Sequence, residues 1–187
     1  FKVLEFYCQG DVLDIGGWNF YTNKVVNNPK IKFKSWTNLE SENNHLAPVS
    51  DNRYRLVLGD GCATEFTDFA FDVVLNVQVL EHVFEPIKMV KEIGRVLKPG
   101  GYGIFLIPQT SVLPHAPEHY YNFTRYWISK VMLESKLRVI KLEAIGGFWT
   151  SIASNLFYFF IQSFKVQGYS TTLHERNPFF YLLFPFM

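Results

Sequence analysis

Short apolar runs alternate with stretches of helical spacing over most of the chain. The run FDVVLNV at residues 71–77 is almost continuously apolar, which is typical of a central strand covered on both faces. This alternation predicts an α/β fold: a Rossmann-like, doubly wound, mostly parallel sheet with helices on both faces. Strands are expected at residues 12–15, 31–39, 56–58, 71–77, 102–107 and 137–145.

The clearest helical pattern follows the fourth expected strand. Pro86 suits its first turn, and Pro99-Gly100 lies beyond its end. A second helix is expected from an N-cap at Thr124 to about Ser135. Asparagines are frequent between residues 18 and 30, so the helix there should be short or irregular, and residues 41–52 should form a loop. The apolar positions of the first helix are Ile87, Val90, Ile93, Val96 and Leu97.

We expect one domain at residues 1–147 and an aromatic-rich extension of it at residues 148–187. Polar residues interrupt the apolar stretch 148–164, which is shorter than the roughly 20 apolar residues that span a bilayer. Core packing is the favoured interpretation of the extension, and a lid, a homodimer surface or a peripheral membrane contact are the alternatives. The chain starts at Phe1 rather than Met and stops in an apolar run, so both ends are expected to be limits of a fragment.

Charge and cysteine content exclude some partners. Eighteen Lys and Arg residues against 17 Asp and Glu residues give a net charge of +1, so no nucleic-acid partner is expected. Cys8 and Cys62 are far apart and have no metal-ligand spacing. This pattern fits a reducing compartment, and we expect a cytoplasmic protein, with membrane association possible only through the extension.

Candidate binding residues follow the expected strands, because doubly wound sheets bind ligands beyond the carboxyl ends of their strands. Glycines after the first strand let the chain turn sharply and approach a ligand closely. A carboxylate after the second strand can accept two hydrogen bonds at once, and Asn38 competes with Glu40 for that role. The candidates are Asp14, Gly16, Gly17, Glu40, Asp60, Gly61, Cys62, Asn76 and Gln78.

Three segments carry a resemblance to a known family: VLDIGG at 12–17, FDVVLNVQVLEHV at 71–83 and RVLKPGG at 95–101. Together they resemble the class I S-adenosylmethionine-dependent methyltransferases over residues 12–145. The resemblance implies S-adenosyl-L-methionine as the cofactor. It places Asp14 and the glycines by the methionine part, Glu40 on the ribose and Asp60 on the adenine amine. It also places the backbone at Cys62 near the adenine ring and Asn76 and Gln78 near the sulfonium.

The glycine loop departs from the pattern of this family. Trp18 and Phe20 occupy the places of its second and third glycines. The alternative is therefore a catalytically inactive binding or interaction domain of the same fold, in which Trp18 fills the cofactor pocket. A nicotinamide dehydrogenase fits less well, because the loop lacks the Gly-x-Gly-x-x-Gly spacing.

The acceptor side is expected in the loop at residues 108–125, which contains two histidines and two tyrosines. If the acceptor is a hydroxyl, His115 or His119 is the candidate catalytic base; the alternative is that both only pack the loop. The adjacent Glu81 and His82 are interpreted as a packing and helix-start element. The acceptor is expected to be a small molecule, a glycan or a lipid-linked compound. A metal site is not expected, because the two histidines alone make an incomplete set of metal ligands.

Overall fold

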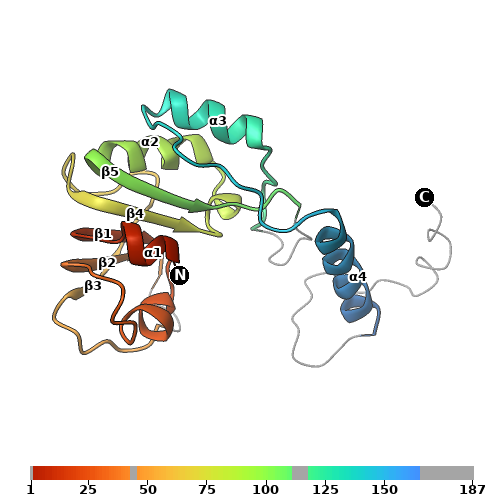
Figure 1. Cartoon of the computed structure of the whole chain (residues 1–187), viewed down its shortest axis with the longest axis horizontal. Coiled ribbons are helices and arrows are strands. Elements are labelled where there is room, and N and C mark those ends of the chain that lie inside the picture. The colour runs from red at the N-terminus through yellow and green to blue at the C-terminus, as the bar shows by residue number, and fades with distance from the viewer. Residues whose placement is uncertain (1, 43–45, 111–117, 165–187) are drawn as a thin grey trace.

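A computed structural model describes residues 2–42, 46–110 and 118–164 of the chain, with side chains described through residue 157 of the last helix. Five parallel strands form one sheet in the order β3-β2-β1-β4-β5. The order reverses between β1 and β4, so the predicted doubly wound α/β fold is confirmed (Figure 1). The elements are α1 (Lys2–Tyr7), β1 (Asp11–Ile15), η1 (Tyr21–Val25), β2 (Ser35–Glu40), β3 (Tyr54–Leu58), β4 (Phe71–Val77), η2 (Leu80–His82), α2 (Pro86–Val96), β5 (Leu97–Leu106), α3 (Arg125–Glu134) and α4 (Phe148–Phe164).

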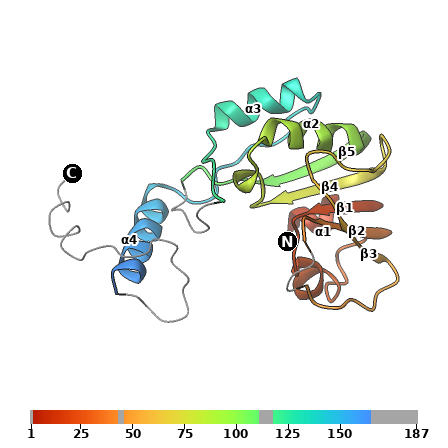
Figure 2. The ribbon, with the colours of Figure 1, turned by 180° about the vertical axis from the view of Figure 1, so that it is seen from behind.

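Two apolar clusters pack on opposite faces of the sheet, because successive side chains of a strand point to opposite sides. Leu13 and Ile15 of β1 face α2 and α3, whereas Val12 faces α1 and η1. Figures 1 and 2 show the helices α2 and α3 on one side and α1 on the other. Both faces of the sheet are thereby removed from water, as the apolar run of β4 predicted.

The predicted helices are confirmed, and their ends have local causes. Helix α2 begins at Pro86 and buries Val90, Ile93 and Val96 against the sheet. The Thr124 hydroxyl accepts a hydrogen bond from the Trp127 backbone N–H at 3.2 Å, which caps α3 as predicted. The irregular crossover is also confirmed, because η1 is a single π-helical turn.

The predicted strand at residues 137–145 is wrong. Its alternating apolar and charged residues resemble a half-buried strand, but residues 138–145 are exposed and pair with no strand in the structure. Lys136 adopts a left-handed conformation with φ 60, and the Leu137 N–H donates to the Met132 carbonyl at 2.9 Å. This helix-ending turn directs the chain away from the free edge of β5, so the segment has no strand to pair with.

Helix α4 lies apart from the sheet domain (Figures 1 and 2). Phe148 and Trp149 belong to neither apolar cluster and are 72% and 77% exposed, so core packing of this part of the extension is wrong. Among the described residues, no helix has the length and apolar character needed to cross a membrane.

Candidate functional site

Parallel pairing brings the strand ends that carry the candidate residues to one edge of the sheet. Ile15 at the end of β1 pairs with Leu39 of β2 on one side and with Asn76 of β4 on the other. Glu40 at the end of β2 pairs with Leu58 at the end of β3. The loops after β1, β2, β3 and β4 therefore share this edge, which we call the carboxyl edge.

Three buried polar side chains lie together on one face of the sheet at this edge. Asp14 pairs with Asn38, and Glu40 is two residues further along β2, so all three point to the same side. Their exposures are only 2%, 1% and 8%. Among the described residues, none forms a hydrogen bond with Asp14 Oδ2 or Asn38 Oδ1. Buried acceptors without donors are costly, so this cluster is built for a ligand that brings hydrogen-bond donors.

Burial also changes the acidity of the cluster. Burial and, to a smaller extent, the nearby charge of Glu40 raise the pKa of Asp14 to about 7, and the Trp36 indole opposes the rise. Burial raises the pKa of Glu40 too, and hydrogen bonds from the Trp18 backbone and the Asn38 side chain oppose that rise. Two carboxyl groups held this close favour a cationic partner between them.

The turn at Gly16-Gly17 lies close against this cluster, because glycine has no side chain. Gly16 has φ 65, a conformation that side chains rarely adopt, and a Cβ there would lie 2.6 Å from Val79 Cγ2. A Cβ on Gly17 would overlap the Asp14 carboxylate. Both glycines that the sequence singled out are therefore needed for the close approach of the turn to Asp14 and Val79.

Trp18 does not fill the space beside the cluster. Its backbone N–H donates to Glu40 Oε1 at 2.5 Å, and its carbonyl accepts from Asn38 Nδ2 at 3.1 Å. The residue has φ 50 and its side chain is 61% exposed, so the indole is directed largely to solvent. The bulky residue in the place of a glycine thus reshapes the loop through its backbone, and most of its indole stays outside the buried cluster.

Replacing Gly17 by alanine is expected to lower the free energy of unfolding by about 1–3 kcal/mol, because the new methyl group must displace the buried Asp14 carboxylate. Urea unfolding monitored by circular dichroism measures the change. Gly147→Ala is the matched control, since no atom of the described chain lies within 4 Å of its added Cβ. Equal effects of the two substitutions would contradict the close packing of the turn on Asp14.

After β3, the chain makes a tight turn at Asp60-Gly61-Cys62. Asp60 is exposed, and its Oδ1 accepts the Cys62 backbone N–H at 2.8 Å. Gly61 is buried, and a Cβ there would lie 2.6 Å from Met89 Cε. Burial and the charge of Asp60 raise the pKa of the Cys62 thiol to about 11, so it stays protonated at neutral pH.

The end of β4 places its two candidates differently. Asn76 is fully buried on the α2 side of the sheet, where Nδ2 lies 3.4 Å from Met89 Sδ and Oδ1 has no partner. Its side chain therefore points away from the face that carries Asp14 and Glu40. Gln78 is exposed with φ 56, and its N–H donates to the Leu106 carbonyl at 2.9 Å.

Backbone hydrogen bonds at Glu81 connect the loop after β5 to the loop after β4. Its carbonyl accepts the N–H groups of Tyr120 at 2.8 Å and Tyr121 at 3.3 Å, which supports the predicted packing role. The carboxyl group is 2% exposed; burial raises its pKa, and a hydrogen bond from its own backbone opposes the rise. The rings of His82 and His119 are 5.5 Å apart. His115, the other candidate base, lies outside the described residues.

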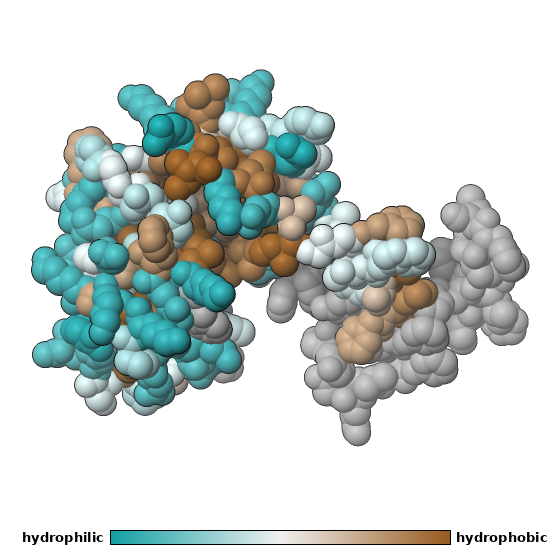
Figure 3. Space-filling view, in the orientation of Figure 1, coloured by the Kyte–Doolittle hydropathy of each residue, from teal (hydrophilic) through white to brown (hydrophobic). Residues whose placement is uncertain are grey.

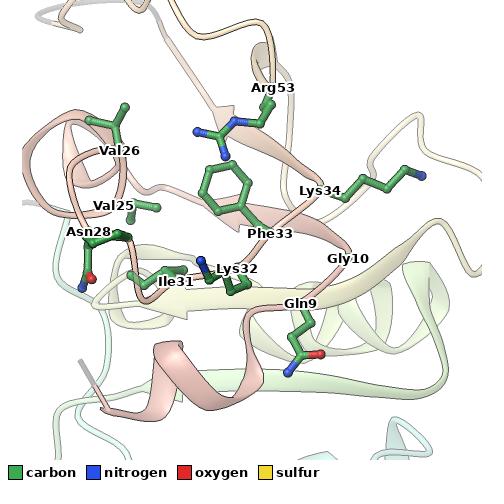
Figure 4. A pocket seen from close by; sticks show the side chains of 11 residues that line it. Gln9, Gly10, Val25, Val26, Asn28, Ile31, Lys32, Phe33, Lys34 and Arg53 are labelled. Atoms are coloured by element: carbon green, nitrogen blue, oxygen red, sulfur yellow. The ribbon is translucent and has the colours of Figure 1, made fainter.

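A cleft of about 490 Å³ opens at the opposite edge of the sheet, where β1, β2 and β3 begin (Figure 4). Arg53 reaches into it with its guanidinium 4.4 Å from the centre of the Phe33 ring. The same guanidinium pairs with Asp51 at 2.7 Å, so its charge is already neutralised. None of the candidate residues that the structure describes lines this cleft, and doubly wound sheets bind ligands at the other edge.

Known proteins are similar to this chain in sequence over part of its length and in fold. Residues 31–105 match the family model described as a methyltransferase domain. No curated protein sequence is significantly similar to the chain.

Solved structures share the fold at low sequence identity. A complex of the Haloferax volcanii Trm112 methyltransferase activator and a methyltransferase described there as putative aligns with a TM-score of 0.66 and 18% identity, covering 75% of this chain and 67% of that one. For a Bacillus halodurans protein also described as a putative methyltransferase, the values are 0.60 and 17%, with coverage of 72% and 65%.

Haemonchus contortus phosphoethanolamine N-methyltransferase 2, solved with phosphomonomethylethanolamine and S-adenosylhomocysteine, aligns with a TM-score of 0.59 and 18% identity. The alignment covers 86% of this chain and 40% of that one. This chain thus spans about two thirds of the first two structures and less than half of the third. The methyltransferase family model over residues 31–105 and the fold shared with these solved structures agree with the resemblance that the sequence motifs indicated.

Proposed function

We propose that the protein transfers a methyl group from S-adenosyl-L-methionine to a small-molecule, glycan or lipid-linked acceptor. The observation that carries the proposal is the set of buried acceptors at the carboxyl edge, Asp14, Asn38 and Glu40. Two of their oxygens receive no hydrogen bond from the part of the chain that the structure describes. A ligand with an ammonium group and hydroxyl groups supplies the missing donors.

The chain's residues fit the parts of this cofactor. Asp14 is suited to hold the α-ammonium of the methionine part, and Glu40 with Asn38 to accept the two ribose hydroxyls. One Asp60 oxygen is free of the Cys62 hydrogen bond in the turn and can accept the adenine amine. Gly16 and Gly17 let the backbone pass close to the ligand. Asn76 is proposed only to support this region, because its side chain lies under α2.

Catalysis then depends mainly on positioning. The cofactor, when bound, supplies a methyl group on a positively charged sulfur, and the protein holds the acceptor in line with it. The loop after β5 approaches this region through its hydrogen bonds to Glu81. For a hydroxyl acceptor, His119 is the proposed base within the described residues, and His115 stays a candidate outside them.

The alternative function, an inactive binding domain with a blocked pocket, requires the Trp18 indole to occupy the cofactor space. The structure exposes 61% of this side chain and directs only its backbone to Glu40 and Asn38. This arrangement favours the enzyme, because an indole that lies largely in solvent does not fill the cofactor space as the inactive domain requires.

Isothermal titration calorimetry of the full chain with S-adenosylhomocysteine tests the proposal directly. We expect saturable binding with one site per chain, and no heat from NADH at the same concentrations, because the turn lacks the backbone geometry for a pyrophosphate. Absence of S-adenosylhomocysteine binding would favour the inactive domain. Binding of NADH instead would overturn the assignment of the site.

A further inference from the structure

The helix α4 presents large apolar side chains that the sheet domain does not cover. Phe148, Trp149, Leu156 and Phe157 are 72%, 77%, 52% and 55% exposed. The helix stands beside the domain at the end of an extended segment (Figures 1 and 2). Leaving four such side chains in water is unfavourable, so this surface is suited to a partner.

The apolar surface continues along the segment that leads to α4. This segment, residues 137–147, is called the connector below. Ile140, Leu142 and Ile145 of the connector are 57%, 43% and 85% exposed. Figure 3 shows hydrophobic surface where the connector leaves the sheet domain and again along α4. The patch is therefore formed by two consecutive elements and is not a single exposed side chain.

The charge pattern indicates what kind of partner suits this surface. Residues 144–164 contain no Asp, Glu, Lys or Arg, and the polar positions described in α4 are uncharged, among them Ser151 and Asn155. The preceding residues 125–143 contain five Lys and Arg residues and two Glu residues. Their net charge of +3 exceeds the +1 of the whole chain. An uncharged aromatic helix that follows a cationic segment complements an anionic lipid surface.

A second copy of the chain fits this surface less well. A helix of 17 residues is about 25 Å long and about 10 Å wide. One face of it is far smaller than the roughly 800 Å² per partner of a standard protein interface. The uncharged helix also has no ionic groups that would fix the register of a helix pair.

We propose that α4 and the connector dock on the surface of an anionic phospholipid bilayer. Phe148, Trp149 and Ile145 enter the boundary between headgroups and acyl chains, where aromatic rings are favourable. Arg138 lies at the level of the anionic headgroups, and so does Lys141, whose exposed ion pair with Glu143 at 3.1 Å is weak in water. The helix lies in the plane of the membrane and does not cross it. The docking goes beyond methyl transfer and does not depend on it.

Cosedimentation of the full chain with vesicles tests the docking. We expect binding to vesicles of phosphatidylcholine mixed with phosphatidylserine, weaker binding to phosphatidylcholine alone, and a loss of this difference in high salt. The double variant Phe148→Ser, Trp149→Ser should reduce the partition coefficient at least about tenfold, because two apolar side chains no longer leave water. Tyr126→Ser on α3 is the matched control: it removes an aromatic side chain that is 78% exposed and should change binding less than about twofold.

Three outcomes would overturn the docking. They are absence of vesicle binding by the unchanged chain, an equal loss in the Tyr126 variant, and a dimer in analytical ultracentrifugation that the double variant abolishes while vesicle binding is absent. Circular dichroism and S-adenosylhomocysteine binding, which should be unchanged in the double variant, separate these outcomes from misfolding. They also separate them from failure of the proposed function, since the carboxyl edge lies outside α4 and the connector.

Discussion

Replacing Asp14 by asparagine is expected to stabilise the fold and to weaken cofactor binding at the same time. Burial holds the pKa of this carboxyl at about 7, against 3.8 for an exposed aspartate. At pH 8 the folded chain must therefore carry a buried charge, which costs up to about 4 kcal/mol. The amide removes this cost, so the free energy of unfolding at pH 8 should rise by on the order of 3 kcal/mol in urea titrations.

The pH dependence separates this cause from better packing. Between about pH 4 and pH 7 folded Asp14 keeps its proton while the unfolded chain loses it, so this group lowers wild-type stability as pH rises through that range. The asparagine variant should lack this decline, whereas Glu65→Gln, a carboxyl-to-amide change at an exposed position, should keep it. Parallel pH profiles for wild type and the Asp14 variant would contradict the assigned burial cost.

The same proton should control ligand affinity. A ligand ammonium favours ionised Asp14, so binding of S-adenosylhomocysteine should weaken as pH falls below about 7, where the free protein holds the proton. The asparagine variant should bind more weakly at pH 8 and show little of this dependence, measured by calorimetry at pH 6 and pH 8. Stability and function therefore oppose each other at this residue, which is expected of a site preformed for a charged ligand.

The parts of the fold that the sequence predicted well are those in which burial dominates. The FDVVLNV run and the apolar positions of α2 predicted their elements because most of their apolar side chains pack in the core. The strand at 137–145 was predicted from alternation alone. Alternation favours a strand only where a neighbouring edge accepts its hydrogen bonds, and the left-handed Lys136 directs the chain elsewhere.

For the candidate site, strand ends were predictable and side-chain directions were not. The sequence offered Asn38 and Glu40 as rivals, but their spacing of two along β2 puts both on the face of Asp14. Asn76, by contrast, pairs with Ile15 and shares its side of the sheet. The conformation of Trp18 could not be predicted, because it depends on hydrogen bonds from its backbone to residues that are 20 and 22 positions away.

Replacing Glu40 by glutamine is expected to lower affinity for S-adenosylhomocysteine by about 10- to 100-fold. Hydrogen bonds to a charged group are worth roughly 1.5–3 kcal/mol, and the substitution removes that charge. Glutamine keeps one oxygen that can accept the Trp18 N–H, so the turn should stay in place and the loss should fall on the ribose contacts. Glu42→Gln, an exposed carboxyl two residues further on, is the matched control and should bind as wild type does. Since adenine alone lacks the two hydroxyls, its weaker binding should be the same in wild type and the Glu40 variant. A loss of adenine binding equal to that of S-adenosylhomocysteine would show that Glu40 acts only through the shape of the loop.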